Sequence, residues 1–249
     1  MARVNGLVKI EGTIEDLTFY KKDGSNYVRR KGGVSKERIS NDPNFVRTRE
    51  NNTEFGHCGS SGKLLRKALG SMVFKAKDGK LSSRLVQVMS RVKNADLTSA
   101  RGMRRVSEGI ASAEGKQHLN GFDFNSRAPF KSVLFAPYDL DTTTGTLSIP
   151  DFKPAEHLAF PAGATHVSIQ NAVMVLDFET EATEITYSPV VNLPLNLVTS
   201  QVSVAPASLP TGTGQTFYVA MLSFYQEING MQYSLKNEEF NVLTILEIL

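Results

Sequence analysis

The side chains best suited to covalent or metal chemistry are few and scattered along this chain. His57 and Cys58 are neighbours, and an imidazole beside a thiol is the beginning of a nucleophilic dyad. Adjacent residues of a helix point about 100° apart, however, so these two side chains do not face each other. The other histidines, His118, His157 and His166, show no H-x-x-x-H spacing and have no second cysteine to join them. The sequence therefore predicts no metal site.

A possible phosphate-binding loop at Gly59 to Lys63 fails at two positions. The pattern G-x-x-x-x-G-K-[ST] requires glycine where the chain has His57, and serine or threonine where it has Leu64. No other motif supplies a nucleophile, a general base or a cofactor-binding site. We therefore expect a protein that is not an enzyme, with no catalytic residue, no cofactor and no small-molecule substrate.

The charged residues are divided unevenly, although the net charge is only +3. Residues 1–131 contain 26 Lys and Arg against 13 Asp and Glu, whereas residues 132–249 contain 2 against 12. Opposed surface charges steer association and disfavour contact between like surfaces. The two parts either face each other within one chain or bring different molecules together. Nucleic-acid binding is a weaker interpretation, because no zinc-finger, bZIP or RNP pattern accompanies the basic residues.

The residues that would carry such a contact come from two places. The basic set belongs to a predicted hairpin, and the acidic set lies around the connection between two predicted strands. Strand addition between them would supply directional backbone hydrogen bonds. The candidate self-association residues are Lys21, Lys22, Arg29, Arg30, Lys31, Asp177, Glu179, Glu181 and Glu184.

A β-ribbon over residues 3–31 is expected to support the basic set. Asp23-Gly24 separates its second and third apolar runs, and such a pair favours a tight turn with positive φ. An isolated ribbon is marginally stable in water, so it must dock on its own chain or on a neighbour. The three runs are Val4, Leu7, Val8 and Ile10, then Ile14, Leu17, Phe19 and Tyr20, then Tyr27 and Val28.

Helices are predicted after the ribbon, and short strands after them. Asn41-Asp42-Pro43 begins a long helix, since Asn or Asp caps free amides and proline suits the first turn. A second helix follows over Leu81 to Val92, and a third within Ala100 to Asn120. From Lys131, short β-branched runs have the spacing of an antiparallel sandwich. The expected strands cover 132–138, 146–149, 166–178, 183–189, 196–204, 215–225, 231–233 and 240–248, with Asn229-Gly230 as a second hairpin turn.

The predicted fold class is α+β: an N-terminal β-hairpin and helical segment over residues 1–130, followed by a C-terminal antiparallel Ig/fibronectin-III-like β-sandwich over residues 131–249. No signal-peptide pattern opens the chain, and no apolar run approaches the roughly 20 residues of a membrane span. The single cysteine fits a reducing compartment. We expect a soluble, cytoplasmic protein without a membrane span.

The N-terminal pattern GLVKIEGTIEDLTFYKKDGSNYVRRKGGVSKERISNDPNFVRTRENNTEF resembles a group of uncharacterised proteins from Bacteroidota. These pair such a hairpin and an R-x-R-E-N-type helix with an immunoglobulin-like C-terminal domain, and the resemblance covers most of the chain. In outline the chain is also similar to cytoplasmic fibril proteins of the rhapidosome-type tubules of gliding bacteria, which implies homopolymerisation. The expected role is a self-assembling structural subunit of a fibre or tube, joined head to tail. The alternative is a nucleic-acid-binding or phage-like structural module.

Overall fold

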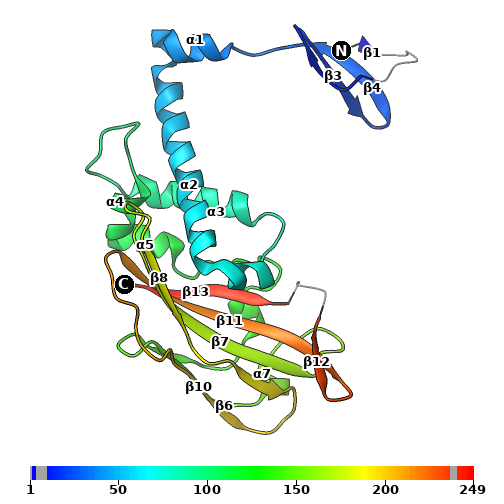
Figure 1. Cartoon of the computed structure of the whole chain (residues 1–249), viewed down its shortest axis with the longest axis vertical. Coiled ribbons are helices and arrows are strands. Elements are labelled where there is room, and N and C mark those ends of the chain that lie inside the picture. Colours follow the sequence, from blue (N-terminus) through cyan, green and yellow to red (C-terminus); the bar gives the residue numbers. More distant parts are fainter. Residues whose placement is uncertain (1, 4–9, 236–239) are drawn as a thin grey trace. The chain divides into compact units, whose positions relative to one another are not determined.

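The structure is a computed structural model that describes residues 2–3, 10–235 and 240–249. The chain forms two compact units, Met1–Arg49 and Glu50–Leu249. This division differs from the predicted one at residue 130, because the helices after residue 50 share a hydrophobic core with the strands that follow them. Figure 1 shows the elements of both units.

The first unit contains a four-stranded antiparallel sheet in the order β1-β4-β3-β2. The predicted hairpin turn is confirmed, since Asp23 and Gly24 have φ values of 49° and 76° between β3 and β4. The predicted residues Val4, Leu7 and Val8 lie outside the described residues. The elements are β1 (Ala2–Arg3), β2 (Gly12–Ile14), β3 (Leu17–Lys22), β4 (Ser25–Arg30), α1 (Lys36–Asn41) and the short 3-10 helix η1 (Pro43–Phe45).

The predicted helix start is also confirmed. Asp42 directly precedes the 3-10 helix Pro43–Phe45, and its carboxylate accepts a hydrogen bond from the Asn44 amide. The long helix that follows is interrupted at Gly70, where φ is 47°. The predicted third helix consists of two short ones, because Ser112 is extended and its hydroxyl caps the second. The helices are α2 (Val46–Lys75), α3 (Leu81–Asn94), α4 (Val106–Ala111), α5 (Ala113–Leu119), α6 (Phe130–Val133) and α7 (Pro154–His157).

Two antiparallel sheets complete the second unit, and the α+β class is confirmed. The predicted strand over 132–138 is wrong: α6 covers its first two residues, with the Phe130 amide donating to Asp123, and residues 134–138 form a loop with one isolated bridge at Leu134. The larger sheet contains β7 (His166–Leu176), β8 (Thr183–Tyr187), β9 (Val191–Pro194), β11 (Gln215–Ile228), β12 (Met231–Ser234) and β13 (Val242–Ile248). The smaller contains β5 (Asp139–Asp141), β6 (Thr146–Phe152) and β10 (Ser200–Val204).

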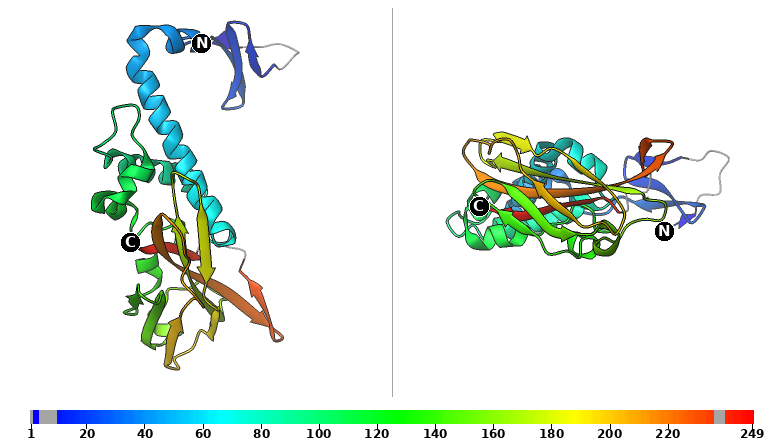
Figure 2. Two further views of the ribbon diagram at one scale, coloured as in Figure 1. Left: turned by 60° about the vertical axis from the view of Figure 1, so that its left-hand side comes forward. Right: turned by 90° about the horizontal axis from the view of Figure 1, so that it is seen from below.

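The six-stranded sheet is covered on both faces (Figures 1 and 2). On one face, Met174 and Met221 join Leu65 and Leu85 of the helices in one buried cluster. On the other, Phe224 packs in a second cluster with residues of the three-stranded sheet. The unit therefore has three layers: helices, the large sheet and the small sheet. Among the helices of the described residues, none is both long and apolar enough to cross a bilayer.

Candidate functional site

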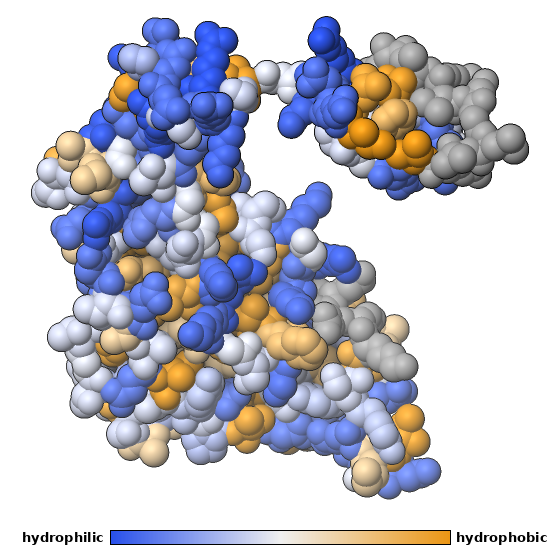
Figure 3. All heavy atoms as spheres, turned by 45° about the horizontal axis from the view of Figure 1, so that its top comes forward, coloured by the Kyte–Doolittle hydropathy of each residue, from blue (hydrophilic) through white to orange (hydrophobic). Residues whose placement is uncertain are grey.

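The N-terminal sheet has one apolar face. Residues that pair directly across antiparallel strands lie on the same face, and alternate residues of one strand share a face. The registers Ile14↔Leu17 and Phe19↔Val28 therefore place these four side chains together. We call Ile14, Leu17, Phe19 and Val28 the sheet face. Figure 3 shows hydrophobic side chains gathered on this unit.

Residues 10–49 supply no buried core beneath the sheet face. None of the described residues 10–49 is buried, and Ile14 and Leu17 remain 52% and 45% exposed. A small sheet normally needs a covered hydrophobic face for stability. This surface consequently requires a partner surface beyond residues 10–49.

The opposite face of the same sheet is aromatic and basic. The rings of Tyr20 and Tyr27 stack with their centroids 5.8 Å apart, and the Arg29 guanidinium lies 5.5 Å from the Tyr20 ring centroid. Among the basic candidates, Lys22 and Arg29 are on this face, whereas Lys21 and Arg30 share the sheet face. Lys31 follows β4, where its amide donates to the Asp16 carbonyl. The structure thus distributes the basic candidates over both faces.

The four acidic candidates lie in the other unit, around the connection from β7 to β8. Their carboxylates are mostly engaged there. Asp177 accepts hydrogen bonds from the amides of Glu179 and Thr180, which lower its pKa.

Glu179 forms an ion pair with Arg105, which lowers the pKa of the glutamate, and it also accepts a hydrogen bond from the Ser107 hydroxyl. Glu184 accepts from the Thr211 amide at 3.1 Å. Glu181 occupies the turn with φ 60°. Because three of the four acids have partners in their own unit, the acidic stretch is a weaker acceptor for basic strands than the sequence indicated.

A buried charge cluster that the sequence did not reveal lies beside α2. The Glu54 side chain is paired with Lys93, and both residues are at most 5% exposed. Arg104 binds the same carboxylate with two nitrogens, at 2.9 and 2.8 Å, and the Gly102 amide adds a bond of 2.8 Å. Arg104 first, then Lys93 and the Gly102 amide, outweigh burial and lower the pKa of Glu54 to about 2.

This cluster fixes the segment 95–105 against α2. Buried Asp96 strengthens it, because its carboxylate accepts the amides of Thr98, Ser99 and Arg105. Sequence reasoning missed the cluster because Lys93 and Arg104 are 39 and 50 residues from Glu54. No local spacing rule connects positions so far apart.

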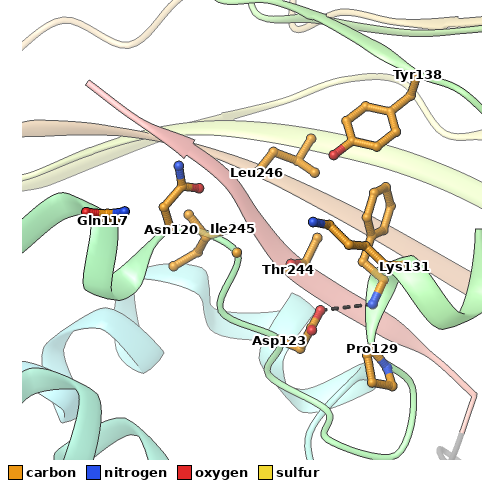
Figure 4. A pocket seen from close by; sticks show the side chains of 11 residues that line it. Gln117, Asn120, Asp123, Pro129, Lys131, Tyr138, Thr244, Ile245 and Leu246 are labelled. Carbon is orange, nitrogen blue, oxygen red and sulfur yellow. Dashed lines mark hydrogen bonds between the residues drawn. The ribbon is translucent and has the colours of Figure 1, made fainter.

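A pocket of about 580 Å³ lies beside β13 and contains Asp123, Lys131 and Tyr138 (Figure 4). Burial raises the pKa of Asp123, and its Oδ1 accepts the Phe130 amide at 3.0 Å. The Asp123 carboxylate thus accepts a hydrogen bond from the first turn of α6. A second, apolar groove on α2 and α3 is lined by Phe55 and Val86. Among the described residues, no three His, Cys, Asp or Glu side chains cluster as a metal site would need.

The comparisons with known proteins return no match to this chain, whether among protein-family models, curated proteins or solved structures. The resemblance to the Bacteroidota group and to rhapidosome-type tubule proteins therefore stays a prediction.

Proposed function

We propose that this protein is a self-assembling structural subunit, in which the N-terminal unit of one copy docks on another copy and extends a homopolymeric fibre or tube. The observation that carries the proposal is the sheet face, whose four apolar side chains have no core within residues 10–49. Heterologous contacts of this kind form an open fibre unless the rotation between copies closes a ring. The role is structural and needs no catalytic group.

The layered charges of the second unit support this arrangement. Residues 55–95, which include most of α2 and all of α3, contain nine Lys and Arg and one acid, Asp78. Asp78 is itself paired with Arg84. Residues 132–249, which supply both sheets, have a net charge of −10. Opposite charges therefore belong to different layers, and association of unlike layers is favoured over association of like ones.

The two sheets of this unit pack face to face over a common cluster, which supports an Ig/fibronectin-III-like arrangement as a finer proposal. Cytoplasmic localisation is part of the same proposal.

A nucleic-acid-binding module is the second candidate, and the aromatic and basic face of the N-terminal sheet favours it. Stacked tyrosines beside an arginine suit single-stranded nucleic acid, because each base can stack on an aromatic ring. Filter binding with single-stranded and duplex DNA tests this role. A phosphate binder loses affinity steeply between roughly 50 and 200 mM salt. Absence of micromolar binding at the lower salt concentration would rule the role out.

Leu17→Thr is expected to abolish assembly while preserving the strand, because threonine keeps β propensity but removes apolar surface from the sheet face. Thr18→Ser, on the opposite face of the same strand, is the matched control and should assemble like the parent. Light scattering and electron microscopy at low salt measure the result. A parent protein that stays monomeric at high concentration in low salt would overturn the proposal.

A further inference from the structure

The hairpin of β11 and β12 extends beyond the neighbouring strands of its sheet (Figure 2). The predicted turn Asn229-Gly230 is confirmed, with φ values of 52° and 77°. The registers Gln226↔Tyr233 and Ile228↔Met231 place these four residues on one face. The register Glu227↔Gln232 belongs to the other face.

The apolar side of this hairpin continues the face of β11 that packs against the three-stranded sheet, past the point where that sheet ends. Ala220, Leu222 and Phe224 of β11 are buried in the cluster shared with the three-stranded sheet. Two and four residues beyond Phe224, on the same face, come Gln226 and Ile228. The three-stranded sheet does not cover this end of the hairpin, since Ile228, Met231 and Tyr233 are 49%, 61% and 53% exposed. We call these three residues the hairpin stripe.

The polar side of the hairpin is held within its own unit. The amides of Gln232 and Asn192 exchange two hydrogen bonds of 3.0 Å. Glu227 lies 3.5 Å from His166 and also accepts from Gln232. Since these contacts hold the hairpin on its polar side, the stripe keeps a defined orientation while its apolar surface stays uncovered.

We propose that the hairpin stripe is the acceptor for the sheet face of a second copy of this chain, an inference that rests on the proposed function. Each surface presents exposed apolar side chains, Ile14 and Leu17 on one and the hairpin stripe on the other, and joining the surfaces removes this apolar area from water. Within the described residues β12 pairs only with β11, so its outer edge is also free to add a strand.

Charge selects this acceptor over the apolar groove at Phe55. Residues 1–49 contain 11 Lys and Arg against 6 Asp and Glu, a net charge of +5. The groove lies among the basic residues of α2 and α3, and Arg91 lines it directly. The hairpin stripe belongs instead to the segment 132–249 with its net charge of −10. A basic unit is attracted to the second surface and repelled by the first.

The test uses two full-length variants, each with one surface damaged. Met231→Thr/Tyr233→Thr keeps residues of high β propensity but removes two of the three apolar side chains of the hairpin stripe, and Leu17→Thr removes one of the two exposed apolar side chains of the sheet face. Ser234→Thr, on the polar side of β12, is the control. We expect the hairpin variant to raise the concentration needed for assembly at least tenfold, and the control to leave it unchanged.

Mixing the two damaged variants gives the sharpest outcome. Each retains one intact surface, so the mixture should form a one-to-one dimer that cannot grow, while each variant alone stays monomeric in analytical ultracentrifugation. A hairpin variant that still forms fibres would overturn this acceptor and leave the proposed function standing. A monomeric mixture beside a polymerising parent would also overturn it, because assembly would then use another pair of surfaces. A parent that never assembles would overturn the proposed function itself.

Discussion

Gly109→Ala is expected to lower the free energy of unfolding by about 3 kcal/mol, which is the upper part of the usual range for overpacking. Helix α4 crosses α3 at this glycine. A β-carbon there would lie 2.0 Å from the Val92 carbonyl oxygen and 2.8 Å from its carbon. Backbone atoms of a packed helix cannot rotate away as a side chain can, so the helices must separate. Gly115 repeats the arrangement, because a β-carbon there would lie 1.9 Å from the Gly109 carbonyl oxygen.

Gly59→Ala is the matched control for this prediction. Gly59 lies within α2, and a β-carbon there would meet no atom within 4 Å. Alanine is favoured over glycine in a helix by about 1 kcal/mol, so this variant should be as stable as the parent or more stable. Urea unfolding followed by circular dichroism measures both. Equal midpoints for Gly109→Ala and the parent would show that the close crossing is not present in solution.

Glu54→Gln is expected to cost about 3 to 5 kcal/mol, because removing one partner of a buried ion pair leaves the other charge uncompensated. Lys93 is 5% exposed and would lose the carboxylate that compensates its charge. The double variant Glu54→Gln/Lys93→Met removes that orphan charge and should regain a large part of the loss. If the double variant loses as much as the two single ones together, the pair is not coupled in the way the structure shows.

The pH dependence of stability gives an independent readout of the same cluster. Glu54 has its pKa lowered from 4.5 to about 2 by Arg104, Lys93 and the Gly102 amide, despite burial. A group with a depressed folded-state pKa stabilises the protein above its unfolded pKa, and this contribution is lost as the pH falls toward the folded value. The parent should therefore lose this stabilisation between pH 4.5 and about 2. Glu54→Gln should show a shallower decline over that window in urea titrations.

The features predicted correctly from the sequence are those that a few neighbouring residues decide. Asp23-Gly24 and Asn229-Gly230 form their turns because these residues tolerate positive φ wherever they are placed. Asp42 caps the following amides for an equally local reason. The segment 132–138 was wrongly predicted as a strand, since Asp123 binds the first amide of α6 from seven residues earlier.

For the candidate self-association residues, too, local features could be predicted from the sequence and long-range contacts could not. The basic residues of the hairpin could be located from the turn alone, but their division between an apolar and an aromatic face required the strand register. From the sequence, the acids at 177–184 were predicted to bind the basic hairpin of another copy. In the structure, however, Glu179 is paired with Arg105, 74 residues away. Contacts over such distances leave no periodic signal, so sequence reasoning could not find them.

The sequence by itself determined the separation of charge, the two hairpins and the α+β composition, because each follows from residue types and their immediate neighbours. Only the tertiary structure decided which apolar surfaces are covered. Phe224 and Ile228 lie on one face of a single strand, but the first is buried under the small sheet and the second is exposed. The physical reason is that coverage depends on where distant segments of the chain end in space.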